Sequence, residues 1–591
     1  MLTLALFLAC RSTPDGASNP VDGTDGPDTT TPDTETTDTR PSPTGTTTTP
    51  TGPTGTTPST TASTANTATT ATTGTTGATA DTGPCGVLPT GLPFDTNTNP
   101  AVTDTGTVCA PVVPEPGCHT TDWVLHGVGS FAQTVRAVDV LPSGDIVVVG
   151  NMQDQFTVAA GRPDEAQVPD PCGVDYKGWI LKVGQDGTVR WARDLLASCS
   201  YAKVRDLHVT PSGELLVWGD YSDVAATVAP GTPSAEALPP PDRKDHWWGR
   251  LDADGQLLAL HAITNPTSNY DFTIHDMAAA DDGTVYAMGV YSDSFTLDPA
   301  TKTPTTVSQD KTCTQVKPHW LAAWDADGTL LWATQECYGA VEMRRLFPTD
   351  DGVLVWSQPI DEVLWGACTP NETVANWSTG NTLPRPLYQA VAHYDRATGQ
   401  LSEKVEAFQA PWLTPGQVER LGQEFIVAGK TADWVYWGRD YGSFDYVMYR
   451  ADSAGQPASK VAASIGPWNK GSPSHLAGND EWLVTAGRGG EDPFQWECGA
   501  VADGHEVGRY VDGDPATWYS FTSDLDPVCG GHVGFTSIDY FGDMDVAIDN
   551  DGGIILATSF LDRMVFFEGT PQETRLEADV VDLLLVRLAP P

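Results

Sequence analysis

The chain has 591 residues and a formal net charge of −45 at pH 7, a strongly acidic balance that repels nucleic-acid phosphates and anionic lipid headgroups. We therefore expect no nucleic-acid partner. No apolar run approaches the about 18 residues that a membrane-spanning helix needs.

Residues 1–10, MLTLALFLAC, form a short apolar segment that ends in Cys10. The segment resembles the end of a bacterial lipoprotein signal, in which the cysteine is lipidated and becomes the mature N-terminus. The resemblance implies lipidation at Cys10 and a place at the outer membrane or cell surface, with the membrane reached only through the lipid. A plain secretion signal is the alternative.

Residues 11–83 are a low-complexity stretch of Thr, Pro, Gly, Asp, Ser and Ala. Such a composition cannot bury enough apolar surface to offset its ordering entropy, so we predict a disordered tether. Residues 84–118 form a transition segment that contains Cys85, Cys109 and Cys118.

From residue 119 onward one β-hairpin pattern recurs, and its clearest copy is VRDLHVTPSGELLVWG at 204–219. Two apolar strands flank a Pro-Ser-Gly turn, and a small residue closes the second strand. The closing residues of successive copies lie 58 to 72 residues apart, a near-constant spacing that indicates a repeat protein. The closing residues are Gly150, Gly219, Gly289, Ser357, Gly429, Gly487 and Thr558.

A second strand pair follows each hairpin, as in GWILKVGQDGTVRWARDL at 178–195, where Asp-Gly favours a tight turn. Four antiparallel strands in each of seven repeats predict an all-β, seven-bladed β-propeller over 119–591. Residues 123–131 align with a fourth strand and 581–589 with a third, so pairing between them would close the ring. Tryptophans recur at the start of the third strand and are predicted to pack between blades: Trp179, Trp247, Trp320 and Trp518.

The cysteines recur in the loops predicted for one face of the disc, which implies an oxidising compartment. The predicted disulfides are Cys172–Cys199, Cys313–Cys337 and Cys498–Cys529, with Cys85–Cys109 as a further candidate. Cys118 and Cys368 either pair with each other or stay free.

The alternation of hairpins such as PSGDIVVVG with pairs such as WILKVGQDGTVRWA resembles the SBBP-type β-propeller repeats of bacterial secreted and surface lipoproteins. The segment AHYDRATG, 392–399, also resembles quinoprotein-like propeller repeats. Quinone-dependent enzymes of that type generally carry a vicinal disulfide, and this sequence has no Cys-Cys pair. The resemblances imply a propeller and export, and we expect no cofactor.

The first strand of each repeat should line the central channel, and its start repeatedly carries a titratable residue. We predict a ligand site for an anion or an acidic glycan at the channel mouth. Its residues are Arg136, Arg205, His275, Arg344 and His475, and Glu419 occupies the same place in the fifth repeat. The alternative is structural pairing with carboxylates of neighbouring blades, namely Asp139, Asp206, Asp276 and Asp539.

Two further patterns have structural explanations beside functional ones. The DADG and DNDG segments at 252–255, 325–328 and 549–552 suggest calcium loops but lack the later Glu, so hairpin turns are favoured and no metal site is predicted. Three other tryptophans could stack on sugars: Trp434, Trp437 and Trp468. We find no GxSxG, HExxH or phosphate-binding glycine motif.

The sequence favours an exported, surface-anchored propeller that acts as a non-catalytic binding or scaffold module. Its partner would be a protein or glycan at the cell envelope, and the chain is expected to be a monomer. One alternative is a glycan-active or quinone-dependent propeller enzyme. Another is a structural envelope protein whose channel is closed by paired charges.

Overall fold

The computed structural model describes residues 119–590 except 171–175, 199, 242–243, 265–271, 292–293, 299–304, 309–317, 339–341, 359–361, 368–372, 377–387, 404–407, 410–412, 423, 432–444, 452–456, 466–471, 480, 489–494, 497–504, 507–508, 511–514, 524, 526, 536–543 and 567–573. Every helix or strand among these residues is a β-strand, so the all-β prediction is confirmed. In this part of the chain, no helix has the length and apolar character that a membrane crossing requires.

Several expectations concern residues outside this description and stay predictions. They include the signal segment with Cys10, the tether at 11–83 and the transition segment at 84–118. Each predicted disulfide includes at least one cysteine outside the described residues. Cys118 and Cys368 also lie outside them. Trp434, Trp437 and Trp468 also lie outside them.

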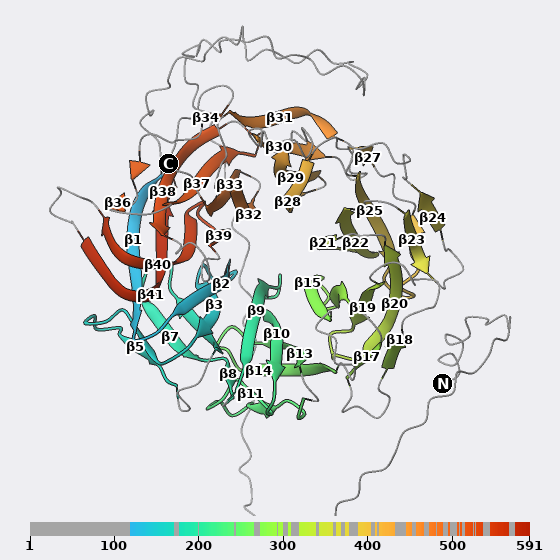
Figure 1. Cartoon of the computed structure of the whole chain (residues 1–591), viewed down its shortest axis with the longest axis horizontal. Coiled ribbons are helices and arrows are strands. Elements are labelled where there is room, and N and C mark those ends of the chain that lie inside the picture. The colour runs from blue at the N-terminus through green and yellow to red at the C-terminus, as the bar shows by residue number, and fades with distance from the viewer. Residues whose placement is uncertain are drawn as a thin grey trace, which may run out of the picture. The chain divides into compact units, whose positions relative to one another are not determined.

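The repeats fold as successive sheets whose main strands pair antiparallel (Figure 1). The first repeat contributes β2 (Gln133–Val140), β3 (Ile146–Met152), β6 (Lys177–Val183) and β7 (Val189–Asp194). The second contributes β9 (Ala202–Val209), β10 (Leu215–Ser222), β13 (Lys244–Leu251) and β14 (Leu257–Thr264). The third contributes β15 (Thr273–Ala279), β16 (Val285–Val290), β19 (Pro318–Trp324) and β20 (Leu330–Tyr338). The fourth contributes β21 (Glu342–Thr349), β22 (Gly352–Gln358), β25 (Tyr388–Asp395) and β26 (Leu401–Glu403).

The remaining repeats follow the same order. The fifth contributes β28 (Leu413–Leu421), β29 (Glu424–Thr431), β30 (Asp445–Ala451) and β31 (Pro457–Ile465). The sixth contributes β32 (Ser472–Gly478), β33 (Trp482–Arg488), β37 (Pro515–Thr522) and β38 (Pro527–Phe535). The last contributes β39 (Asp545–Ile548), β40 (Ile554–Phe566) and β41 (Thr574–Ala589). Additional short strands are β27 (Phe408–Gln409), β34 (Gln495–Trp496), β35 (His505–Glu506) and β36 (Arg509–Tyr510).

The first described strand, β1 (Thr120–Gly129), pairs antiparallel with β41 near the other end of the chain. Thr120 lies opposite Ala589, and Gly127 lies opposite Leu583. This strand therefore occupies the fourth place in the sheet of the last repeat, beside β39, β40 and β41.

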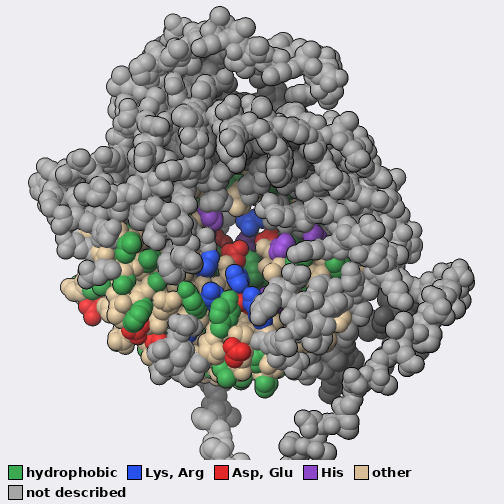
Figure 2. All heavy atoms as spheres, in the orientation of Figure 1, with side chains coloured by type: hydrophobic (Ala, Val, Ile, Leu, Met, Phe, Trp, Pro, Cys, Tyr) green, Lys and Arg blue, Asp and Glu red, His purple; other side chains and the backbone are tan. Residues whose placement is uncertain are grey.

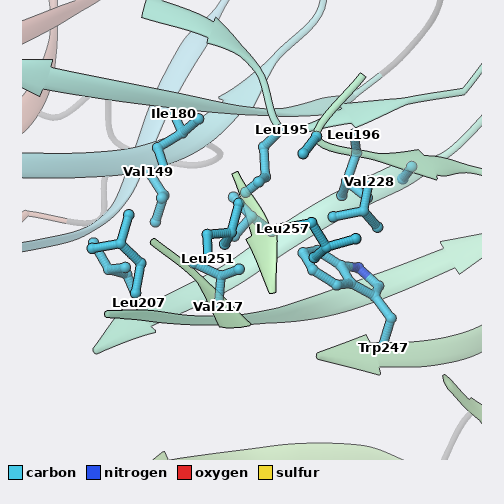
Figure 3. Packing of buried hydrophobic residues seen from close by; sticks show 14 of the residues in the cluster. Val149, Ile180, Leu195, Leu196, Leu207, Val217, Val228, Trp247, Leu251 and Leu257 are labelled. Carbon is cyan, nitrogen blue, oxygen red and sulfur yellow. The ribbon is translucent and has the colours of Figure 1, made fainter. Parts of the chain in front are cut away.

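The hydrophobic core is divided among clusters that lie between neighbouring sheets. In one cluster, Val149 and Ile180 of the first repeat pack against Leu207, Val217 and Trp247 of the second (Figure 3). A sheet that buries both faces in this way shows near-continuous apolar strands. The side chains of all four recurring tryptophans are fully buried in these clusters.

In the first six repeats, the first strand carries a β-bulge near its start, where one extra residue interrupts the pairing. The interrupting residues are Arg136, Arg205, His275, Arg344, Gly416 and Ser474. The residue before each bulge lies opposite one of the closing residues of the sequence repeat, which are Gly150, Gly219, Gly289, Ser357, Gly429 and Gly487.

The bulge explains why glycine recurs at that place. A Cβ on Gly219 would lie 1.9 Å from the carbonyl oxygen of Lys203 and 2.9 Å from the indole nitrogen of Trp247. Gly150 and Gly289 are enclosed in the same way by a carbonyl and a tryptophan. In the fourth repeat the closing residue is a serine, and it lies opposite an alanine instead of a tryptophan.

The long loops between the second and third strands contain small β-hairpins that the sequence analysis missed. Each hairpin pairs with an outer strand of the preceding repeat, so it ties two neighbouring sheets together. The hairpins are β4 (Phe156–Val158) with β5 (Ala166–Val168), β11 (Thr227–Val228) with β12 (Glu236–Ala237), β17 (Ser294–Leu297) with β18 (Thr305–Ser308), and β23 (Glu362–Ala367) with β24 (Thr373–Asn376). Their partners are β1, β8 (Leu196–Ala197), β14 and β20, respectively.

Candidate functional site

The first strands of the repeats line one cavity of 360 Å³. Figure 1 shows these strands around the centre of the described sheets. In the described chain they are β2, β9, β15, β21, β28, β32 and β39, and we call them the innermost strands.

Five carboxylates line this cavity beside the cations Arg136 and Arg345, and we call it the acidic cavity. Its carboxylates are Asp139, Asp206, Asp276, Glu419 and Asp545. Arg345 approaches two of them, with Nη1 3.5 Å from Asp276 Oδ1 and Nη2 3.9 Å from Glu419 Oε2. His475 Nδ1 lies 3.1 Å from Asp545 Oδ1. Asp139 and Asp545 keep part of their side-chain surface exposed, whereas Asp276 is buried.

Some of these carboxylates also join neighbouring innermost strands. Asp139 Oδ2 accepts a hydrogen bond from the amide of Val209 at 2.6 Å. The amide of Leu346 donates in the same way to Asp276, also at 2.6 Å. A carboxylate fixed by a backbone amide is held in position, so the wall of the cavity is rigid.

Burial favours the protonated form of the cavity carboxyls. It raises the pKa of Asp206 to about 8, and Arg345 opposes the shift only in part. Burial likewise raises the pKa of Glu419 to about 7, again against the attraction of Arg345. Within the described residues, no group of three His, Cys, Asp or Glu side chains is placed to hold a metal ion.

A second cluster, rich in cations, lies at the starts of strands in the first and second repeats. Its cations are Arg136, Lys203, Arg205 and Lys244, and Asp220 lies among them. We call this cluster the basic pocket. Four cations and one carboxylate give it a formal charge of about +3, opposite in sign to the whole chain. In Figure 2, Lys and Arg side chains gather beside the central opening on the described part of this face.

Asp220, in β10, is the buried centre of the basic pocket. Arg205 Nε donates a hydrogen bond to Oδ1, and Lys244 Nζ lies 3.2 Å from Oδ2. Burial alone would raise the pKa of Asp220, but the cations outweigh it and hold the pKa at about 2. The carboxylate therefore stays ionised and keeps both cations in position.

Lys203, in β9, lies between two aromatic rings. Its Nζ is 3.9 Å from the ring centre of Tyr176 and 4.7 Å from that of Tyr201. Among the described residues, no carboxylate lies within ion-pair distance of this amine. Burial and then the cations Arg205, Arg136 and Lys244 lower the pKa of Lys203 to about 8, although the carboxylate of Asp220 opposes this shift.

The backbone around the basic pocket is tightly held. Tyr176 has a φ of 54°, a conformation that costs a bulky side chain about 1–3 kcal/mol and that often accompanies functional sites. Its carbonyl accepts a hydrogen bond from the amide of Ala202 at 3.1 Å. The buried Asn151 side chain donates to the carbonyl of Val204 at 3.0 Å and accepts from its amide at 2.9 Å. These contacts fix β9 against the first repeat, so the cations are positioned before any ligand arrives.

The structure divides the predicted channel-mouth residues between these two places. Arg136 and Arg205 belong to the basic pocket, and both Arg136 and His475 line the acidic cavity. His275 lies on β15 with its ring centre 6.3 Å from that of His319. Arg344 lies in β21, and its side chain is outside the described residues.

Two details of the predicted site differ from the structure. The alternative paired Arg205 with a carboxylate of a neighbouring innermost strand, but its partner is Asp220 in the same sheet. Glu419 and His475 were placed level with Arg136, but the bulge places are held by Gly416 and Ser474. The predicted partner Asp539 lies outside the described residues.

Sequence reasoning missed Lys203, Lys244, Asp220 and the two tyrosines. One signal was present, because a lysine begins the third strand in both of the first two repeats, as Lys177 and Lys244. The suggested calcium loops are hairpin turns: Asp252 Oδ1 accepts from the amides of Asp254 and Gln256, and Gly255 has a φ of 72°.

Comparison with known proteins yields no family. No protein-family model matches the chain, and no curated protein does. Solved structures to which the chain is similar include the β-propeller domain of the Trilobed protease from Pyrococcus furiosus (7% identity, TM-score 0.34, covering 75% of this chain and 97% of that one) and the WD40 domain of SCAP from fission yeast (8%, 0.31, 79% and 96%). Another is Drosophila Plexin A in complex with Semaphorin 1b (9%, 0.33, 80% and 88%).

Proposed function

We propose that this chain is an exported, surface-anchored, seven-bladed β-propeller that acts as a non-catalytic binding module, with an anionic ligand held in the basic pocket. The observation that carries the proposal is the gathering of Arg136, Lys203, Arg205 and Lys244 around a single carboxylate, in a chain whose net charge is −45. Like charges repel one another, so four cations at one place favour an anion that neutralises them.

The closed ring is supported by contacts at several levels. The strand β1 completes the sheet of β39, β40 and β41. Core clusters lie between the last and first repeats as well as between earlier neighbours. A closed propeller leaves only short, protected sheet edges, which limits edge-to-edge association of a β protein. The same rigid ring would hold the basic pocket at a fixed geometry.

Geometry suits the basic pocket to a carboxylate, sulfate or phosphate group. Guanidinium groups offer paired donors to such anions, and the tyrosine rings beside Lys203 offer flat surfaces to a sugar ring. A glycan that carries acidic groups combines both features. The envelope of a cell presents many such glycans, which agrees with an anchored protein.

The binding test uses the full chain and isothermal titration calorimetry. Sodium sulfate and a galacturonate trisaccharide are titrated beside neutral maltotriose. We expect saturable binding of the two anions only, weakening as salt screens the cations. Arg136→Met should weaken binding about 10-fold, the loss of one charged hydrogen bond.

The matched control is Arg162→Met, which removes a cation whose partner is Asp164 on the surface of the first repeat. It should leave the affinity unchanged. Absence of saturable anion binding, or equal affinities for Arg136→Met and the unaltered chain, would reject the proposed ligand.

Export and anchoring need a separate test. In a bacterial host fed an alkyne analogue of palmitate, the full chain should become labelled and reach the cell surface. Cys10→Ser should abolish the label, because that thiol is the proposed acceptor. An unlabelled chain that is nevertheless secreted would favour the plain secretion signal.

The five carboxylates that meet in the acidic cavity favour a second candidate, a glycan-active enzyme. Asp206, with a pKa of about 8, stays protonated at neutral pH, as a general acid must. Such an enzyme should release nitrophenol from nitrophenyl glycosides, and Asp206→Asn should abolish the release.

A quinone-dependent enzyme would instead show cofactor absorbance after purification. A structural envelope protein would bind none of the ligands named above.

A further inference from the structure

Three polar side chains of the fourth repeat, Ser402, His393 and Asp351, lie in a row outside the acidic cavity and the basic pocket. Ser402 Oγ is 2.5 Å from His393 Nδ1, and His393 Nε2 is 3.2 Å from Asp351 Oδ1. Thr349 Oγ1 donates a hydrogen bond to the same oxygen of Asp351 at 3.0 Å and lies 3.2 Å from Nε2. A hydroxyl, an imidazole and a carboxylate in this order can activate the serine as a nucleophile.

A β-bulge brings the serine to the imidazole. The pairing of β25 with β26 skips Ser402, which is the extra residue of a bulge beside His393. Such a bulge changes the direction of a side chain. The same bulge recurs in the first three repeats, where the extra residue is Arg190, Leu258 or Leu331. The hydroxyl is therefore particular to the fourth repeat and is not required by the fold.

The imidazole also replaces a different kind of group. In the first two repeats the place of His393 is held by a cation that pairs with a nearby carboxylate. These pairs are Lys182 with Asp145 and Arg250 with Glu214. A charged lysine or arginine can only donate hydrogen bonds, whereas a neutral imidazole donates through one nitrogen and accepts through the other. In the fourth repeat the ring can therefore accept a proton from a neighbouring hydroxyl.

The carboxylate decides which ring nitrogen carries the proton. The hydrogen bond from Thr349 is the largest of the effects that lower the pKa of Asp351, so this carboxylate is ionised at neutral pH and only accepts. In its neutral form the His393 ring thus carries its one proton on Nε2, and the lone pair of Nδ1 faces Ser402. The hydroxyl of Ser402 also lies 3.1 Å from the carbonyl oxygen of His393, but the ring nitrogen is the nearer acceptor.

We infer that Ser402 is a nucleophile that hydrolyses carboxylic esters, with His393 as its general base and Asp351 as a positioning residue. Oγ attacks the ester carbonyl carbon and forms a C–O bond, while its proton passes to Nδ1. The bond between that carbon and the alcohol oxygen then breaks, and the alcohol leaves with the proton. Water releases the acyl group from the serine by the same route, so the products are an acid and an alcohol.

This activity is additional to the proposed anion binding and does not depend on it. Ser402 and Asp351 are exposed, so the ester can be part of a large molecule that would not enter a closed pocket.

The test incubates the full chain with a fluorophosphonate probe, which reacts with activated serines, and maps the products by peptide mass spectrometry. We expect Ser402 to react about 100-fold faster than an ordinary exposed serine, within the range that a positioned general base contributes. Ser143 is the internal control, because it is exposed in a turn and its Oγ accepts from the amide of Asp145. The chain should also release nitrophenol from nitrophenyl acetate, and Ser402→Ala should lower that release at least about 10-fold.

Variants of the other two residues separate catalysis from structure. His393→Gln keeps hydrogen-bonding groups but offers no base, so labelling of Ser402 should fall to the rate of Ser143 while the urea midpoint stays unchanged. Asp351→Asn should slow labelling at least about 10-fold, because an amide can donate to Nε2 and reverse the tautomer. Asp351→Glu should restore most of the rate, and Asp350→Asn, in the same exposed turn, should leave it unchanged.

Two results would overturn the inference. One is labelling of Ser402 in the unaltered chain that is no faster than that of Ser143. The other is equal labelling with and without the His393 ring. In either case the row is a structural contact of the fourth repeat, and titration of sulfate still decides the proposed function separately.

Discussion

Because Gly219 has no side chain, the backbones of two neighbouring strands can approach each other closely there. At Gly219 the bulge at Arg205 pushes the carbonyl of Lys203 toward the glycine, and Trp247 covers the same spot from the next strand. The glycine is therefore required by lack of space and not by an unusual φ. Where the covering residue is small, as at Ala390, a serine is accommodated.

We predict that Gly219→Ala lowers the free energy of unfolding by about 1–3 kcal/mol, the usual cost of overpacking a core. The added Cβ would meet the Lys203 carbonyl at 1.9 Å, so the two strands must separate. Urea unfolding followed by tryptophan fluorescence measures the change. Ser357→Ala is the matched control, because a Cβ already fits there and only a 3.3 Å hydrogen bond to Ala390 is lost. Equal midpoints for the two variants would contradict this explanation.

The raised pKa of Asp206, about 8, predicts how stability depends on pH. The folded state holds this proton more tightly than the unfolded chain does, so the stabilisation is complete below pH ~4 and is lost as pH rises toward 8, by up to about 1.4 kcal/mol per pH unit. The groups that oppose or reinforce the shift are Arg345, Asp545 and Asp276.

Asp206→Asn should therefore flatten the fall in melting temperature between pH 6 and pH 8.5, measured by calorimetry. Asp327→Asn, which alters an exposed turn, should leave that fall unchanged. A pH dependence that is the same for Asp206→Asn and the unaltered chain would show that this carboxyl is ionised in both states.

At the level of single residues, the sequence predicted only part of the candidate site. Arg136 and Arg205 could be found because they recur at one place in the repeat. Lys203 and Asp220 could not, because a bulge changes which face a side chain takes, and no pattern in the sequence marks the bulge. Trp518 shows the same limit. In the sequence it is equivalent to Trp247, which lies opposite the closing residue Gly219, but the residue opposite Gly487 is Thr517.

Among the elements, the loop hairpins have the clearest structural role. Val228 of β11 is buried beside Leu196 of β8, so the hairpin of the second repeat is held against the first. These loops lie between neighbouring sheets and pair with strands of the preceding repeat. They therefore stabilise the contact between sheets, whether or not they also bind a ligand.

We predict that Val228→Ser opens this hairpin locally by about 2 kcal/mol, the cost of losing the buried methyl groups and burying a hydroxyl. Hydrogen exchange of the β11 and β12 amides should speed up about 30-fold, while the innermost strands stay protected. Val224→Ser is the control in the same loop, since its side chain is 43% exposed. Unchanged exchange in Val228→Ser would mean that the hairpin is held by other contacts.

The sequence predicted the main strands of the repeats but not the short strands in the loops. The hairpin of β9 and β10 and the glycine turns that follow β6 and β13 came from apolar runs with turn residues between them. The two-residue strands β11 and β12 are too short to show a period, and their partner β8 belongs to another repeat. Pairing between distant short segments depends on the assembled sheets, so the sequence showed only a long loop.

For the whole molecule, the proposed ring depends on β1 in the place of a missing outer strand. Leu125 of β1 is buried in the core between the last and first repeats, whereas Val128 of the same strand is 38% exposed. Leu125→Ala should lower the free energy of unfolding by about 2–5 kcal/mol, and Val128→Ala should change it little.

Differential scanning calorimetry distinguishes a ring from an open array. If the sheets form one closed ring, Leu125→Ala should shift a single transition to lower temperature, because no sheet can open alone. A separate early transition that leaves the rest unchanged would indicate sheets that unfold independently, as in a linear repeat array.

The pairing of β1 with β41 also decides how the protein would respond to mechanical load. Any pull on the chain ahead of Thr120 reaches the described sheets through β1, whose pairing with β41 extends from Thr120 to Gly127. Tension directed along the strand would load those bonds together in shear, whereas tension across it would break them one after another. The direction of the pull, and not only its size, would then determine whether the sheet of β1 and β41 holds or opens.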